Sequence, residues 1–185
     1  MDLDDSIQRF EQEVMEKPNQ PLPHYNLGYC YKAENRSDDA IRMYERAIQL
    51  DPDNNISFLS HYGLAQIYCL QHEFDEALQQ FEKAAEDLPS LKVRGVEERR
   101  RHESILYQSW GMTLYSKVWN AKFYGSERKD LVSAQQYLER ALRLDPQDDE
   151  SRSLLKIIKK GLETGIVIFD KEDSIVKDIP GTDEW

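Results

Sequence analysis

The sequence predicts an all-α fold built from repeated pairs of helices, an α-solenoid. Amphipathic segments with helical periodicity recur along the chain, and four of them close at Pro18, Pro52, Pro89 and Pro146. Because proline cannot continue a helix, each one marks the end of a unit. Repetition at a period of roughly 20–50 residues is typical of solenoids, in which each unit packs mainly on its neighbours.

The spacing of apolar residues predicts eight helices. They are expected at residues 3–16, 23–33, 37–50, 56–70, 74–87, 97–123, 129–144 and 148–162. The last of these carries an apolar stripe on one face and lysines on the other, which indicates a helix that caps the open end of the last repeat.

The spacing of the prolines shows where the array is irregular. Pro18 and Pro52 lie 34 residues apart, Pro52 and Pro89 lie 37 apart, and Pro89 and Pro146 lie 57 apart. The third unit is therefore the longest. Its extra residues lie on both sides of Trp110, because the distances from Pro89 to Trp110 and from Trp110 to Ala134 both exceed the corresponding distances in the first unit. An extension of its first helix by whole turns would keep the buried face in phase.

Three units share small residues where two helices can approach closely, with large residues between them. In the first unit the set is His24, Leu27, Gly28, Tyr31, Ala40, Tyr44, Ala47 and Pro52. In the second it is His61, Leu64, Ala65, Tyr68, Ala77, Phe81, Ala84 and Pro89. In the third it is Tyr107, Trp110, Gly111, Leu114, Ala134, Leu138, Ala141 and Pro146. The pattern resembles the tetratricopeptide repeat (TPR) over about residues 4–146.

This resemblance implies a right-handed superhelix of helix-turn-helix TPR units with a C-terminal capping helix. We expect one solenoid over residues 1–162 and an acidic tail over 163–185. The solenoid would consist of a half repeat and three full repeats before the cap. Their expected bounds are 3–20 for the half repeat, 21–54, 58–91 and 97–148 for the repeats, and 148–162 for the capping helix.

The half repeat departs from the pattern. Phe10 and Pro18 match it, but Ser6 and Glu13 stand where alanines are expected. Two readings stay open: the segment is a genuine cap, or it packs on a helix of a partner or of a second copy and so supports self-association.

Composition excludes several function classes. The net charge of −11 argues against nucleic acid and against docking on anionic lipid, because both need clustered Lys and Arg. No apolar run is long enough to insert into a membrane, and the acidic N-terminus does not resemble a signal peptide, so a cytoplasmic or nuclear location is expected. The two cysteines, Cys30 and Cys69, do not form a disulfide framework.

The sequence offers no catalytic centre. Phosphate-binding loops, HExxH, CxxC and nucleophile-elbow motifs are missing, and the carboxylates lack calcium-loop spacing. His24 and His61 occupy the same repeat position, so shared packing explains them better than chemistry. We expect no enzyme activity, no cofactor and no metal.

In the family, the first helix of each repeat lines a concave groove that binds a peptide. Helical spacing places seven residues of this chain on that groove: Tyr25, Tyr29, Tyr62, Gln66, Gln108, Met112 and Tyr115. Tyrosine offers a large apolar face and a polar tip, which suits binding. The alternative is that some of these tyrosines pack between helices.

Family members that bind the C-terminal tails of heat-shock chaperones hold the terminal carboxylate with a clamp of Lys, Asn and Arg. The matching positions of this chain hold Tyr25, Tyr29, Gly63, Ile105 and Ser109. None of them can hold a carboxylate by charge, so heat-shock tails are rejected as partners.

Two further features of the third unit stand out. Arg99, Arg100 and Arg101 could dock an acidic partner segment or the acidic tail, or could form a solvated helix face. The aromatics Trp119, Phe123 and Tyr124 could form an interface, or could pack on the capping helix or the tail.

Together these features predict a protein–protein interaction module: an adaptor, an assembly factor or a chaperone for one client. It would bind a peptide or helix of a partner in an aromatic groove. The alternative is a permanent structural subunit of a larger complex, docked through the extended helix of the third repeat.

Overall fold

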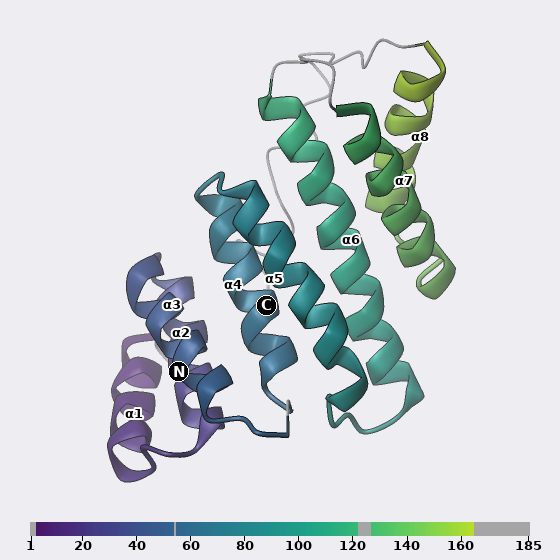
Figure 1. Ribbon diagram of the computed structural model, residues 1–185. Coiled ribbons are helices and arrows are strands. Elements are labelled where there is room, and N and C mark those ends of the chain that lie inside the picture. The colour runs from purple at the N-terminus through teal and green to yellow at the C-terminus, as the bar shows by residue number, and fades with distance from the viewer. Residues whose placement is uncertain (1–2, 54, 122–126, 165–185) are drawn as a thin grey trace. The chain divides into compact units, whose positions relative to one another are not determined.

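The structure is a computed structural model that describes residues 3–53, 55–121 and 127–164 (Figure 1). Its helices are α1 (Leu3–Glu16), α2 (Pro21–Ala33), α3 (Ser37–Gln49), α4 (Ser57–Leu70), α5 (Phe74–Asp87), α6 (Val96–Asn120), α7 (Glu127–Leu144) and α8 (Asp149–Thr164). A short 3-10 turn, η1 (Leu88–Ser90), follows α5. The described residues contain no strand, and none of their helices is long and apolar enough to cross a membrane.

The predicted all-α fold class is confirmed, and the helices differ from expectation mainly at their ends. α2 begins at Pro21, because proline fits the first position of a helix, where no backbone N–H is needed. α8 continues to Thr164, two residues beyond its expected end at residue 162, and buries Gly161. The predicted end of α6 at residue 123 lies outside the described residues.

The chain divides into two compact units, Met1–Lys92 and Val93–Trp185, here called unit 1 and unit 2. In unit 1, α2 pairs with α3 and α4 pairs with α5, while α3 packs on α4 (Figure 1). Both pairs turn in the same way. Asn35 and His72 adopt positive φ angles of 57° and 61° just after α2 and α4, and the next backbone N–H bonds back to Tyr31 or Tyr68.

Tyr44 of α3 joins the two helix pairs of unit 1. Its side chain is 1% exposed and lies against glycines of both flanking helices. A Cβ atom added at Gly28 of α2 would lie 3.0 Å from the ring, and one added at Gly63 of α4 would lie 2.6 Å from it. The repeat therefore needs small residues at these points, because the ring fills the space between α2 and α4.

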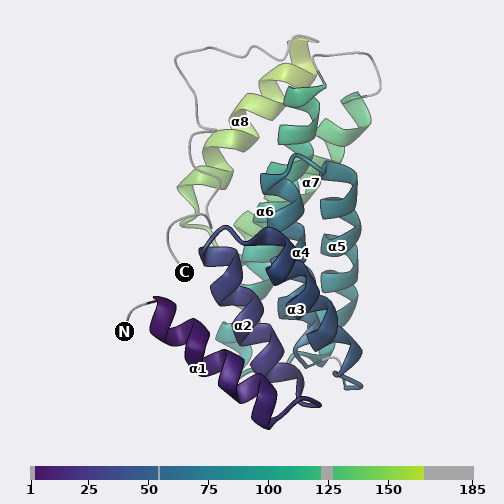
Figure 2. The ribbon, with the colours of Figure 1, turned by 90° about the vertical axis from the view of Figure 1, so that its left-hand side faces the viewer.

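α1 packs along α2 at one end of unit 1 (Figure 2). Ile7 is buried in the core, and Leu3, Phe10 and Val14 pack against the same cluster. The Tyr31 hydroxyl donates a 2.7 Å hydrogen bond to Glu11, which ties the two helices together. The outward residues of α1 are mostly polar, with Met15 as the exposed apolar side chain, so this helix shows the surface expected of a cap.

The insertion before α4 is organised by one carboxylate. Asp51 is 5% exposed, and its Oδ2 accepts hydrogen bonds from the backbone N–H of Ile56 at 2.5 Å and of Ser57 at 2.8 Å. It also accepts one from the Ser57 hydroxyl at 3.0 Å. Asp51 therefore caps α4 from across the turn and fixes where the second repeat begins.

Unit 2 consists of α6, α7 and α8, with α7 packed against both of the others. α6 and α7 meet closely at Gly111, where an added Cβ would lie 2.7 Å from Leu138 Cγ. The Arg100 guanidinium donates to the carbonyl of Leu144 at 2.6 Å and so caps the end of α7. α8 buries Leu154 and Ile158 and presents lysines outward.

We predict that Gly63→Ala destabilises the chain, because the new methyl group overlaps the Tyr44 ring. Overpacking costs about 1–3 kcal/mol, which exceeds the gain of up to about 1 kcal/mol from alanine's helix propensity. The midpoint of urea unfolding, followed by circular dichroism, should fall. The loss should shrink in a Tyr44→Leu background, and a Gly63→Ala chain as stable as the parent would contradict the packing described here.

We also predict that Asp51→Ala lowers the free energy of unfolding by about 1–2 kcal/mol through loss of the α4 cap. Amide hydrogen exchange should accelerate in the first turn of α4. Ser57→Ala, which removes only the hydroxyl contact, serves as the milder control. Unchanged exchange in Asp51→Ala would show that the cap contributes nothing.

Candidate binding surface

In unit 1, α2 and α4 are each the first helix of a repeat, and a side-chain hydrogen bond links them. Lys32 of α2 donates a hydrogen bond from Nζ to Gln66 Oε1 of α4 at 2.5 Å. The Lys32 ammonium also lies 5.4 Å from the centre of the Tyr29 ring. Because residues three or four apart share a helix face, Tyr25, Tyr29 and Lys32 follow one line along α2. Tyr62 and Gln66 follow the corresponding line on α4; these five residues are called the α2–α4 surface.

The tyrosines of the α2–α4 surface divide into two kinds. Tyr25 packs 5.8 Å from Tyr44, and burial raises its pKa to about 12. Tyr62 lies between Phe58 and Phe81, with ring centres 6.4 and 6.0 Å away. Both tyrosine rings are half-buried, and each packs against other aromatic rings. Tyr25 and Tyr62 therefore correspond to the alternative in which some of the tyrosines pack between helices. Tyr29 is half-buried beside the lysine.

Lys32 is the distinctive charge of this surface. Its side chain is half-buried, and desolvation lowers its pKa from the usual 10.5 to about 8. Within the described residues no carboxylate oxygen lies at salt-bridge distance from its ammonium, and its hydrogen-bond acceptor is a neutral amide. The sequence pattern did not identify Lys32, which lies outside the five clamp positions. Its place one turn beyond Tyr29 was the available signal.

The other three predicted groove residues belong to unit 2. Gln108 Nε2 donates to Asp148 at 3.2 Å and to Glu150 at 3.3 Å, which links α6 to the start of α8. Met112 and Tyr115 are buried, with 9% and 7% exposed, and burial raises the pKa of Tyr115. Met112 and Tyr115 therefore offer a partner little surface, whereas Gln108 is half-buried, and the placement of the three residues on a binding groove stays a prediction.

The arginine cluster is partly used within unit 2. Arg100 caps α7 and lies 3.9 Å from Glu97, whereas Arg101 is exposed. Trp119 is half-buried near the end of α6, where Lys117 forms an ion pair with Asp130 of α7 at 3.6 Å. Phe123, Tyr124 and the acidic tail beyond residue 164 lie outside the described residues, so their predicted docking stays a prediction.

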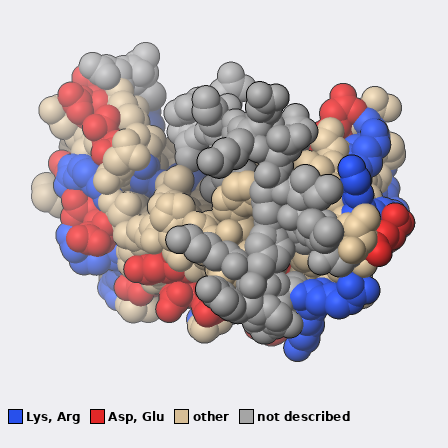
Figure 3. All heavy atoms as spheres, turned by 90° about the horizontal axis from the view of Figure 1, so that it is seen from above, with Lys and Arg blue, Asp and Glu red and all other residues tan. Residues whose placement is uncertain are grey.

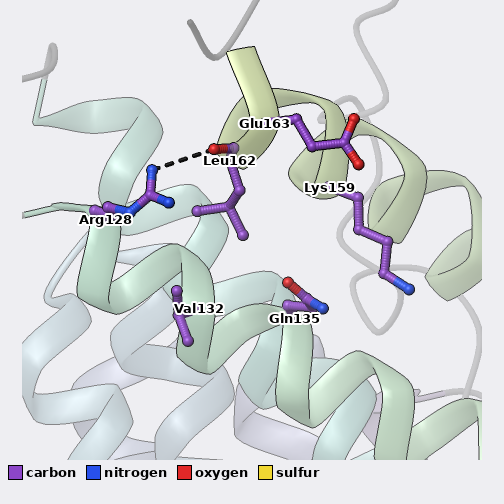
Figure 4. Close-up of a pocket in the computed structure, with 6 residues that line it drawn as sticks. All are labelled: Arg128, Val132, Gln135, Lys159, Leu162 and Glu163. Atoms are coloured by element: carbon purple, nitrogen blue, oxygen red, sulfur yellow. Dashed lines mark hydrogen bonds between the residues drawn. The ribbon is translucent and has the colours of Figure 1, made fainter. Parts of the chain in front are cut away.

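An open hollow lies between α7 and α8 (Figure 4). The Arg128 guanidinium on one side donates to the Leu162 carbonyl at 3.2 Å. Lys159 on the other side pairs with Glu139 at 2.9 Å, and this contact lowers the pKa of Glu139. Two of the charged groups that line the hollow, Arg128 and Lys159, are thus engaged within unit 2.

In the part of the chain that the structure describes, neither the charged side chains nor the histidines gather into a catalytic or metal centre. Acidic and basic side chains both reach the face seen in Figure 3. His24 bonds the Pro18 carbonyl at 3.0 Å, and His61 bonds Gln80 at 2.8 Å, both in packed surroundings. No group of three potential metal ligands occurs among the described residues.

Comparison with known proteins decides the family. Family models of the tetratricopeptide repeat match residues 21–54 and 58–91, which span the α2–α3 and α4–α5 pairs. The two helix pairs of unit 1 are tetratricopeptide repeats. The resemblance stated from the sequence is thereby confirmed, and the close approach of Gly28 to Tyr44 is packing that its pattern of small residues predicts. No curated protein matches the sequence.

The solved structures include a similar TPR protein. The crystal structure of YrrB, described as a TPR protein with an unusual peptide-binding site, aligns with a TM-score of 0.62 and 20% sequence identity. The alignment covers 84% of this chain and 68% of YrrB. At this identity the likeness shows the fold, and it confirms the all-α helical-repeat class.

We predict that Lys32 titrates near pH 8. Because its pKa of about 8 lies below the usual 10.5, the folded chain binds fewer protons than the unfolded chain between these values. The free energy of unfolding should therefore gain a contribution that grows as pH rises through this window. The titration can be followed by ¹³C NMR of lysine Cε, with Lys32→Met to assign the signal. A midpoint above pH 10 would contradict the desolvated environment.

Proposed function

We propose that this TPR protein is a protein-interaction module that binds an extended or helical segment of a partner on the α2–α4 surface. The observation that carries the proposal is the juxtaposition of Tyr29, Lys32 and Gln66 on two adjacent first helices. Aromatic, amide and cationic groups lie together there, which is the mixture found at binding hot spots. The role would be that of an adaptor, an assembly factor or a chaperone for one client.

Two independent findings support binding rather than catalysis. The family models identify a repeat whose members serve in protein contacts, and YrrB, which shares the fold, is described as having a peptide-binding site. Among the described residues, the two histidines described above are held by packing and by hydrogen bonds, and neither forms part of a set of nucleophile, base and orienting group. We therefore propose a non-enzymatic role, with a cytoplasmic or nuclear location.

Heat-shock chaperone tails remain excluded in this proposal. The positions that would hold their terminal carboxylate are occupied on α2 and α4 by Tyr25, Tyr29 and Gly63. Gly63 has no side chain to offer a ligand, and the Tyr44 ring lies against it. A partner of another kind is required.

The permanent-subunit alternative gains no support from α6. The extended part of this helix is engaged within unit 2, through Arg100 at one end and Lys117 at the other. Val118 near its C-terminal end is fully buried. Self-association through α1 is likewise not favoured by its mostly polar outer residues.

The test uses a phage-displayed library of random 12-residue peptides selected on the full chain. We predict that peptides are enriched and that Tyr29→Ala and Gln66→Ala each raise the Kd of a selected peptide about tenfold, which corresponds to about 1.4 kcal/mol. Fluorescence anisotropy measures the Kd. These two side chains are chosen because neither fills the core.

The matched control is Gln79→Ala, which removes an exposed side chain of the same type from α5. It should leave the Kd unchanged. Failure to enrich any peptide, or equal loss of affinity in Gln79→Ala and Gln66→Ala, would refute binding on the α2–α4 surface.

A further inference from the structure

We propose that Lys32 and Gln66 form an acid-recognition subsite that binds a side-chain carboxylate, from Asp or Glu, of the partner segment. The inference rests on the proposed function, because it assigns chemistry to the partner bound on the α2–α4 surface. It arises from three observations: a half-buried cation, a neutral partner for that cation, and a second donor beside it.

The charge of Lys32 is poorly compensated by the described part of the chain. A half-buried ammonium loses part of its hydration free energy. A hydrogen bond to a neutral amide oxygen compensates this loss less than a hydrogen bond to a carboxylate would. The depressed pKa is consistent with this loss. In a chain with net charge −11, most cations can find acids nearby, as Arg36, Arg42 and Lys159 do. A partner's carboxylate would supply what Lys32 lacks.

The hydrogen bond to Lys32 also fixes the orientation of the Gln66 amide. An ammonium only donates, so Gln66 must turn Oε1 toward Lys32. The amide nitrogen Nε2 is then left with two N–H donors on the same side chain. Lys32 Nζ and Gln66 Nε2 together present donors from adjacent helices, which suits the two oxygens of one carboxylate.

The Tyr29 ring favours apolar or aromatic residues next to the acidic residue of the partner. Tyr29 lies beside the ammonium, and Tyr25 and Tyr62 continue the two lines of residues one turn earlier. A segment seated here would place its carboxylate at Lys32 and apolar or aromatic side chains along the tyrosines.

The subsite occurs in one repeat. The position of Lys32, eight residues beyond His24, corresponds to Cys69 beyond His61 and to Tyr115 beyond Tyr107. Neither equivalent residue carries a positive charge. A single acidic position, rather than an acidic run, is therefore the expected feature of the partner.

This subsite differs from a terminal-carboxylate clamp. The five clamp positions hold no cation, whereas Lys32 lies outside them and acts with one amide. A displayed peptide fused at its C-terminus has no free terminal carboxylate, so any acid that it needs must be a side chain. Display of this kind therefore separates the two sources.

The experiment selects the same fused 12-residue library on the full wild-type chain and on Lys32→Gln. We expect wild-type selections to fix Asp or Glu at one position next to aromatic or apolar residues. In Lys32→Gln selections that acidic preference should disappear while the apolar pattern persists. Lys17→Gln, which removes an exposed lysine from the turn before α2, is the matched control and should retain the acidic position.

Binding constants make the comparison quantitative. A selected peptide and its Glu→Gln or Asp→Asn variant are measured by anisotropy on wild type and on Lys32→Gln. Loss of the charge from either side should weaken binding about tenfold or more, and loss from both sides should add little further. Thermal unfolding confirms that Lys32→Gln is folded, which is expected because the substitution removes a desolvated charge.

The outcomes separate the two proposals. Enriched peptides without an acidic position, or with one that survives Lys32→Gln, overturn the acid-recognition subsite and leave peptide binding standing. No enriched peptide at all overturns the proposed function, and the subsite with it. An acidic position that is lost equally in Lys17→Gln also overturns the subsite, because the effect would then be one of net charge.

Discussion

The structure of unit 1 depends on the fit of the Tyr44 ring between Gly28 and Gly63. The ring fills the space between α3 and its partner helix α2 and the space between α3 and α4 of the next repeat. Because repeats of a solenoid pack mainly on their neighbours, the fit helps to keep α2 and α4, which also contact each other directly, next to one another. The hydrogen bond from Lys32 to Gln66 needs that spacing between α2 and α4, so the proposed binding chemistry depends on the two buried glycines, Gly28 and Gly63.

The fold could be predicted because its determinants are local in the sequence. Prolines at the ends of units and small residues at fixed positions are enough to place the helices, since each repeat solves the same packing problem. Helix ends were less predictable where tertiary contacts decide. Asp51 caps α4 from across the insertion, and α8 extends two residues beyond its expected end at residue 162. Neither effect follows from the propensity of the residue alone.

The candidate site was only partly predictable. Helical spacing identified Tyr29 and Gln66 because each lies in line with a recognisable repeat position. It did not identify Lys32, whose role comes from the register between two helices and from the desolvation of its ammonium. It also assigned Gln108, Met112 and Tyr115 to the same groove, although contacts within unit 2 engage Gln108 and burial covers the other two. Repeat position determines the direction of a side chain, but its neighbours decide whether it can meet a partner.

We infer that a partner segment binds on the α2–α4 surface. The most direct measurement is a ¹H–¹⁵N and ¹H–¹³C NMR titration of the full chain with a library-selected 12-residue peptide. We predict that the largest changes in chemical shift fall on Tyr29, Lys32, Tyr62 and Gln66, with the Lys32 Cε signal moving toward its protonated position. Shift changes confined to unit 2, or spread evenly over the chain without a focus on α2 and α4, would contradict it.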